Sequence, residues 1–182
     1  MVKKQILDSL RNYFRWEQGS AKGREVIYVN GKYDNRLVAH PGGMMRFLTL
    51  RLDPQGRLAM RANRHSLQNS GMEKITELIE SNYYLAQKKG INAIRCAGED
   101  NFDGRAVWII EGIFPPEQGF YARKVLILIA KSIRLPVKVS IFDWSDELIE
   151  EYAFRDLKIN VGLTEADFNP GNPDYNYFRG LK

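Results

Sequence analysis

The sequence predicts an α+β protein dominated by a curved antiparallel β-sheet, and three observations support this fold class. Short segments in which apolar and polar residues alternate recur along most of the chain, separated by turn-forming sequences such as Asn30-Gly31. The segment Ser70–Lys89 has apolar residues at helical spacing. Near Arg155-Asp156 the apolar residues switch from even-numbered to odd-numbered positions. This switch indicates a β-bulge, and a bulge bends the strand that contains it.

Four strands are expected in the first third of the chain, at Arg24–Val29, Arg36–His40, Phe47–Leu52 and Arg57–Arg61. Alternation in the last two predicts one buried and one wetted face, and the wetted positions are largely arginine. The segment before Trp16 is ambiguous between helix and strand, and its apolar spacing favours a short helix. The apolar residues of this segment are Ile6, Leu7, Leu10, Tyr13 and Phe14.

The main helix is expected to begin at Ser70. Ser70 and Glu73 have the spacing of a capping box, in which each side chain accepts a hydrogen bond from the backbone N–H of the other. Lys88 and Lys89 favour the C-terminal end of the helix dipole, and Gly90 can adopt the left-handed conformation that closes a helix. One face of this helix is apolar and must pack against the sheet.

The second half of the chain predicts two hairpins followed by a long strand. The first hairpin joins Ala93–Ala97 to Ala106–Phe114, and the second joins Lys124–Ala130 to Pro136–Phe142. The long strand, Ile149–Val161, carries the expected bulge. The tail that follows is rich in proline and glycine, and we expect it to be an ordered, packed loop.

Length and composition favour one globular domain over residues 1–182, in which residues 1–20 are the hardest to assign. The chain has 44% apolar and 27% charged residues, which excludes a disordered protein. The longest aliphatic run, Val125–Ala130, is far shorter than the about 20 residues that span a bilayer. Polar residues interrupt the segment after Met1–Lys4, so we expect a cytosolic protein or a secretion signal outside this chain.

The positive charge is concentrated in the first third of the chain. Residues 1–64 carry 13 Lys and Arg against 5 Asp and Glu, whereas the whole chain has a net charge of +5. Arg51, Arg57 and Arg61 are the arginines expected to contact an anionic surface, with Arg46 and Arg64 beside them. Three roles are open for these arginines: a plain solvated face, contact with an anionic lipid surface, or contact with the phosphate backbone of a nucleic acid. Nucleic acid is the least favoured partner, because no aromatic residues are interleaved with the arginines.

No enzyme motif occurs in the sequence, and we expect no catalytic residue, cofactor or metal. The two histidines, His40 and His65, lack the converging ligands of a metal site, so turn and cap hydrogen bonds are the expected roles. Cys96, the sole cysteine, excludes an internal disulfide and is expected to be a buried, inert thiol.

Several sequence blocks at both ends of the chain form a familiar pattern. They are Gly23–Val29, Leu37–Gly43, Leu50–Pro54, Ala62–His65, Asp156–Thr164, Asp167-Phe168 and Asn172–Tyr177. These blocks resemble a bacterial family of unknown function, DUF1571. The second half of the chain is also similar to the wider superfamily of periplasmic lipoprotein carriers and sorting proteins.

This resemblance implies a strongly curved half-barrel with helices on its concave side and an apolar cavity that shelters acyl chains. It also implies a periplasmic or cell-envelope location, and a lipid or a lipidated protein as partner. One alternative is that the apolar strand faces form a filled core without a ligand; the chain would then be a protein-interaction domain.

The other alternative is a nucleic-acid-binding module that uses the basic first third of the chain. The expected cavity-lining residues are Trp108, Ile110, Leu126, Leu128, Val139 and Ile141.

Overall fold

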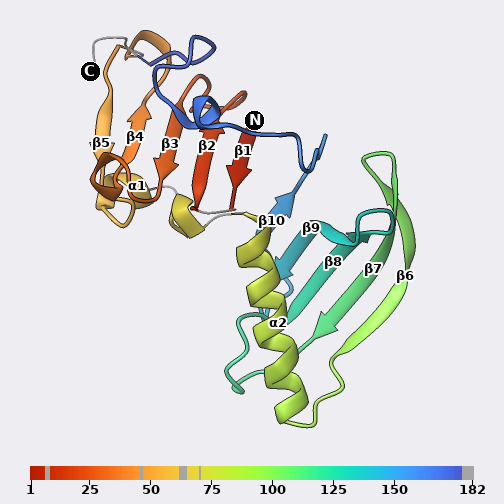
Figure 1. Cartoon of the computed structure of the whole chain (residues 1–182). Coiled ribbons are helices and arrows are strands. Elements are labelled where there is room, and N and C mark those ends of the chain that lie inside the picture. The colour runs from red at the N-terminus through yellow and green to blue at the C-terminus, as the bar shows by residue number, and fades with distance from the viewer. Residues whose placement is uncertain (7–8, 46, 62–64, 70, 178–182) are drawn as a thin grey trace. The chain divides into compact units, whose positions relative to one another are not determined.

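The computed structural model describes residues 1–6, 9–45, 47–61, 65–69 and 71–177. The chain divides into two compact units, of which the first comprises Met1–Ser70 with Asn160–Lys182 and the second comprises Gly71–Ile159. Each unit contains one five-stranded sheet in which every pairing is antiparallel (Figure 1). That residues 1–182 form one domain stays a prediction.

The sheet of the first unit has its strands in chain order from β1 to β5. A short helix, α1 (Arg57–Met60), and several 3₁₀ turns, including Glu165–Phe168, accompany this sheet. The strands are β1 (Val2–Gln5), β2 (Arg11–Arg15), β3 (Glu25–Val29), β4 (Leu37–His40) and β5 (Leu50–Leu52).

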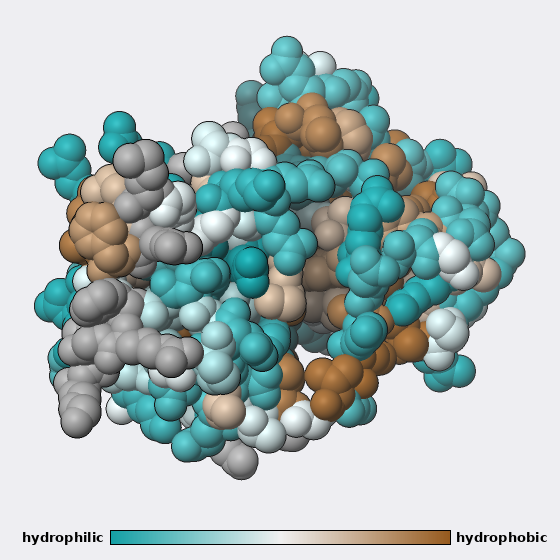
Figure 2. Space-filling view, turned by 90° about the horizontal axis from the view of Figure 1, so that it is seen from above, coloured by the Kyte–Doolittle hydropathy of each residue, from teal (hydrophilic) through white to brown (hydrophobic). Residues whose placement is uncertain are grey.

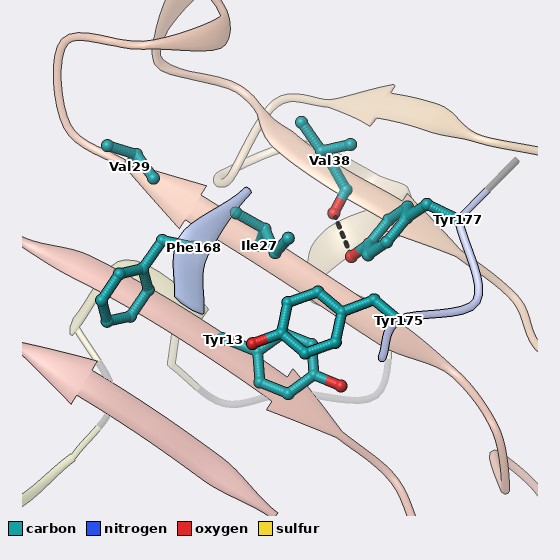
Figure 3. Packing of buried hydrophobic residues seen from close by; sticks show 7 residues of the cluster. All are labelled: Tyr13, Ile27, Val29, Val38, Phe168, Tyr175 and Tyr177. Carbon is teal, nitrogen blue, oxygen red and sulfur yellow. Dashed lines mark hydrogen bonds between the residues drawn. The ribbon is translucent and has the colours of Figure 1, made fainter. Parts of the chain in front are cut away.

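Both faces of this sheet are covered. Phe168, Tyr175 and Tyr177 of the C-terminal tail pack on one face, with Tyr13 and Ile27 beneath them (Figure 3). The other face packs against the segment that follows β5, and its buried and half-buried residues include Val26, Tyr28, Leu37, Ala39, Ala59 and Leu67. The expectation of an ordered, packed tail is confirmed as far as residue 177.

Two expectations for the first unit are wrong. The segment before Trp16 forms strands β1 and β2 rather than a helix, because Tyr13 and Phe14 pair directly with Ile27 and Val26 of β3. A strand whose two faces are both covered needs apolar residues of both parities, which resembles helical spacing.

The second wrong expectation is the strand at Arg57–Arg61. This segment begins with the helical turn α1 and adds no strand to the sheet. The Gly56 carbonyl accepts the Met60 N–H, and Ala59 packs beneath the sheet beside Leu52, so the alternation of the sequence reflects a turn with one inward residue.

The sheet of the second unit has the order β10-β9-β8-β7-β6, and helix α2 (Met72–Lys88) packs on one of its faces (Figure 1). Register shifts interrupt three of its four pairings, and such irregularities bend strands. The strands are β6 (Ile94–Phe102), β7 (Arg105–Ile113), β8 (Lys124–Ala130), β9 (Leu135–Phe142) and β10 (Leu148–Ala153).

The predicted α+β class with antiparallel strand pairing and one main helix is confirmed, although the strands form two sheets rather than the single sheet expected. Neither sheet closes on itself within the described residues, as a half-barrel requires. Ser70, and with it the predicted capping box, lies outside the described residues. Gly71 precedes α2 in an unusual backbone conformation, with φ +123°, and provides no side-chain cap.

The bulge predicted near Arg155-Asp156 is wrong, because β10 already ends at Ala153. The parity change marks the point where the chain leaves the sheet. There the Asp156 N–H donates to Oδ2 of Asp103 at 2.7 Å, and the register shift of β10 lies between Leu148 and Glu150.

Gly42 is a position at which the first unit requires glycine. Its φ is +79°, and a Cβ there would lie 2.6 Å from the backbone N of Arg24. Gly31 has a similar φ of +78° but no heavy atom within 4 Å of an added Cβ. Comparing the two glycines therefore separates backbone strain from steric exclusion.

We expect Gly31→Ala to lower the free energy of unfolding by about 1 kcal/mol, the cost of a left-handed residue. Gly42→Ala adds overpacking against backbone and should cost about 2–4 kcal/mol in total. Urea denaturation of both variants measures the difference. Equal losses in the two variants would contradict the close approach of the Gly42 turn to Arg24.

Candidate functional site

The α2 side of the β6–β10 sheet is the candidate ligand-binding surface. Cross-strand pairing aligns Ile110 of β7, Ile127 of β8, Val139 of β9 and Tyr152 of β10 in one row across the sheet. Ile75 of α2 packs against this row, and with Ile127 and Val139 it belongs to a buried cluster. The centre of this face is therefore shielded from water.

Around this centre the apolar surface is only partly covered. Half-buried apolar side chains pack against the cluster, contributed by α2, by β7, β8 and β10, and by the residue that follows β10. These are Leu78, Ile79, Ile110, Val125, Ile129, Ile149, Tyr152 and Phe154. Hydrophobic residues reach the molecular surface at several places among hydrophilic ones (Figure 2). One helix leaves this apolar face incompletely shielded from water.

The strand register divides the six residues expected to line a cavity. Trp108, Ile110, Val139 and Ile141 lie on the α2 side, because each shares the face of the buried cluster. Leu126 and Leu128 flank Ile127 in β8, so they point to the opposite face. The six residues do not share one face, and their role as a lining stays a prediction.

Trp108 lies on the same side as Ile110 and near charged groups. Its indole is half-buried, and Nζ of Lys131 lies 5.6 Å from the ring centroid. Lys131 also forms an ion pair with Glu99, the residue that pairs with Trp108 across β6 and β7. Charged residues therefore border the apolar surface here.

A buried carboxylate on the α2 side was missed by sequence reasoning. Glu150 is 8% exposed and pairs with Ile141 of β9. The Tyr152 hydroxyl donates to its Oε2 at 2.7 Å, and the Tyr121 hydroxyl donates to its Oε1. Parity places Glu150 and Tyr152 on one face, but nothing local in the sequence predicts the contact with Tyr121.

The three arginines expected to contact an anionic surface are all exposed, although they do not form a sheet face. Arg51 lies in β5, and its guanidinium is 3.5 Å from the Asp34 carboxylate. Arg57 begins α1, and Arg61 follows it by one turn. Arg46 and Arg64 lie outside the described residues.

The first unit contains a buried polar centre around Glu25, which the sequence analysis also missed. Glu25 and His40 are a direct cross-strand pair, and both are almost fully buried. Oε1 of Glu25 accepts a hydrogen bond from Nδ2 of Asn176 at 2.8 Å, and Oε2 lies 3.6 Å from Nε2 of His40. The Gly42 N–H donates to Nδ1 of His40 at 3.1 Å. One carboxylate thus connects β3, β4 and the C-terminal tail.

Tyrosines enclose this centre. Tyr175 stacks on Tyr13 with the ring centroids 4.1 Å apart, and the Tyr177 hydroxyl donates to the Val38 carbonyl at 3.0 Å (Figure 3). Burial and the nearby charge of Glu25 raise the pKa values of Tyr13 and Tyr177, so both phenols stay protonated at neutral pH.

Hydrogen bonding also explains the ionisation of Glu25. Burial alone would raise its pKa, but the His40 contact and the hydrogen bonds from Asn176 outweigh burial and lower the pKa below 4.5. Because Asn176 of the C-terminal tail donates to Glu25 through both its backbone N–H and its side-chain amide, ionised Glu25 stabilises the docked tail. A glutamate within a strand of β-branched residues was the available sequence signal.

Among the residues considered for reactivity, the role expected of His40 is confirmed and the burial expected of Cys96 is wrong. His40 forms the expected turn hydrogen bond through Nδ1. The expectation that Cys96 is buried is wrong, because it lies exposed on the edge strand β6 beside a register shift. Among the described residues, no group of three or more His, Cys, Asp or Glu could hold a metal ion. No helix in the described ranges is long and apolar enough to cross a membrane.

Sequence comparison identifies the family. A model of DUF1571, a family of proteins of unknown function, matches residues 2–177. The chain belongs to this family. The resemblance based on the sequence blocks is thereby confirmed, and no curated protein matches the chain.

Solved structures are similar to this DUF1571 chain at low sequence identity. A DUF1329 family protein from Desulfovibrio piger is 14% identical over 82% of this chain and 59% of its own, with a TM-score of 0.37. A domain assigned to outer-membrane lipoprotein sorting from Vibrio parahaemolyticus is 15% identical over 88% and 63%, with a TM-score of 0.39.

MucB, in the MucA/MucB complex of Pseudomonas aeruginosa, is 16% identical over 92% of this chain and 48% of its own, with a TM-score of 0.49. The DUF1571 chain therefore spans less than two thirds of each of these three proteins.

The lowered pKa of Glu25 predicts how the stability of the DUF1571 chain depends on pH. The unfolded chain binds this proton more tightly than the folded chain. The stability that Glu25 confers is therefore fully present above about pH 4.5, the ordinary value, and is lost as the pH falls through the folded-state pKa.

We expect Glu25→Gln to flatten the acid limb of a plot of unfolding free energy against pH. The control is Asp174→Asn, which removes an exposed carboxylate from the same tail and should keep the limb of the parent protein. Urea titrations between pH 3 and 7 make the comparison. An unchanged limb in Glu25→Gln would contradict the assigned role of the carboxylate.

Proposed function

We propose that this protein binds a hydrophobic ligand of the acyl-chain class, a lipid or the lipid portion of a lipidated protein, without catalysing a reaction. The ligand lies against the α2 side of the β6–β10 sheet, and the protein acts in the cell envelope. The observation that supports this is the set of half-buried apolar side chains, from the sheet and from α2, that pack against Ile127 and Val139.

The chemistry of this surface favours a flexible apolar ligand. Its half-buried residues are mostly branched aliphatic side chains, which offer contact area but few directional groups. Removing a methylene group from water stabilises a complex by about 0.8 kcal/mol, so ten methylenes contribute about 8 kcal/mol before ordering costs. An acyl chain can lie along these half-buried side chains, where a rigid polar metabolite would leave its own polar groups unpaired.

Native mass spectrometry of gently purified protein, followed by solvent extraction, tests the proposal. A bound mass of several hundred daltons that extracts as lipid supports it. A clean apo mass with no uptake of added fatty acid or phospholipid contradicts it, and favours a filled core and a protein partner instead.

A pair of variants localises the site. Ile110→Gln places a polar group on the α2 side, and Leu126→Gln makes the same change at a half-buried position on the opposite face. We expect Ile110→Gln to raise the Kd for a fluorescent fatty acid about tenfold, because about 1.4 kcal/mol of apolar contact is lost. Leu126→Gln should change the Kd less than twofold.

A third variant keeps the test informative where a buried polar group reduces folding. Ile110→Trp retains an apolar surface but occupies space beside α2, and it should also weaken fatty-acid uptake. Far-ultraviolet circular dichroism checks the fold of each variant. Equal losses in the Ile110 and Leu126 variants would refute the assignment to the α2 side.

A further inference from the structure

Helix α1 presents an unusual combination of exposed side chains. Arg57 and Arg61 are four residues apart and Leu58 and Arg61 are three apart, so all three lie on neighbouring positions of the helical turn. Ala59 faces inward, toward the cluster beneath the sheet. Leu58 is 69% exposed, the largest fraction among the large apolar side chains that the structure describes. Arg57, Leu58 and Arg61 together are called the α1 surface below.

No residue that the structure describes compensates the positive charge of the α1 surface. Neither Arg57 nor Arg61 forms an ion pair with a described residue, whereas Arg51 is 3.5 Å from Asp34. The carboxylate that precedes α1 in the chain, Asp53, accepts the Gln55 N–H within its own turn. Two guanidinium groups are therefore available beside an exposed leucine.

We propose that the α1 surface docks the protein onto an anionic lipid bilayer. The two guanidinium groups contact headgroup phosphates, for which their planar donors are well suited. The Leu58 side chain enters the boundary between headgroups and acyl chains, where its apolar area leaves water. This surface belongs to the first unit, so the inference goes beyond ligand binding by the second unit.

The leucine favours a membrane over the other anionic partners. A phosphate backbone attracts arginines equally well, but single-stranded nucleic acid binds to aromatic stacking platforms, and the exposed apolar residue beside these arginines, Leu58, is aliphatic. A bilayer is the partner that binds both parts of the α1 surface, the charge by its headgroups and the leucine by its apolar layer.

Vesicle cosedimentation of the full chain tests the proposal. We expect binding to vesicles of phosphatidylglycerol and phosphatidylcholine, and little binding to phosphatidylcholine alone. Arg57→Gln/Arg61→Gln should weaken binding about 25-fold, because about 1 kcal/mol per basic residue corresponds to about fivefold each. Leu58→Ser should weaken it about tenfold and leave the salt dependence of binding unchanged.

Matched variants in the second unit serve as controls. Lys88→Gln/Lys89→Gln removes the same charge from two exposed positions, and Leu148→Ser removes a leucine that is 53% exposed. Both controls should bind anionic vesicles within twofold of the parent protein. Equal losses in the controls and the α1 variants would overturn the docking surface in favour of a diffuse effect of net charge.

Two further results would also overturn the proposal. One is equal binding to anionic and zwitterionic vesicles. The other is binding of an oligonucleotide that Arg57→Gln/Arg61→Gln weakens while vesicle binding is unaffected. Uptake of a soluble fluorescent fatty acid is measured in parallel and should be the same in the α1 variants. Failure of docking is thus distinguished from failure of the proposed ligand binding.

Discussion

An antiparallel sheet has two faces, and apolar side chains on each face must be shielded from water by another layer. In the first unit, the C-terminal tail covers one face and the segment after β5 covers the other. In the second unit, α2 covers its side of the sheet, but the residues around the buried centre stay half-exposed. On the α2 side, among the described residues, eight half-buried apolar residues pack against five buried ones, and this surface is the one proposed to bind the ligand.

The first unit has a charged residue in its interior, where an ionised side chain without partners would lower stability. Glu25 is fully buried; Asn176 of the C-terminal tail donates two hydrogen bonds to its carboxylate, and Nε2 of His40 in β4 lies 3.6 Å from it. The blocks that carry the DUF1571 resemblance supply Glu25, His40 and Asn176, so segments distant in sequence meet at this centre. The tail is therefore an integral layer of the first unit, and its packing also orders Tyr175 and Tyr177 over β2 and β4.

Strand alternation, hairpin signals and helical spacing were sufficient to predict β3, β4, the two hairpins of the second unit and α2. These patterns were insufficient where contacts with residues distant in the sequence decide which structure a segment adopts. Arg57–Arg61 alternates, yet forms a turn because only Ala59 packs inward. The expected cavity lining combined Leu126 with Val139, because parity within one strand does not show which face points inward, and cross-strand pairing puts them on opposite faces. The Glu25 and Glu150 contacts join residues far apart in the chain, which a single sequence does not predict.

Photo-crosslinking with a fatty acid that carries a terminal diazirine locates the bound ligand residue by residue. We expect the modified residues to lie on the α2 side of the second sheet, around Ile110 and Ile129, and on the inward face of α2. Crosslinks concentrated at Leu126 and Leu128, or within the covered sheet of the first unit, would contradict this expectation.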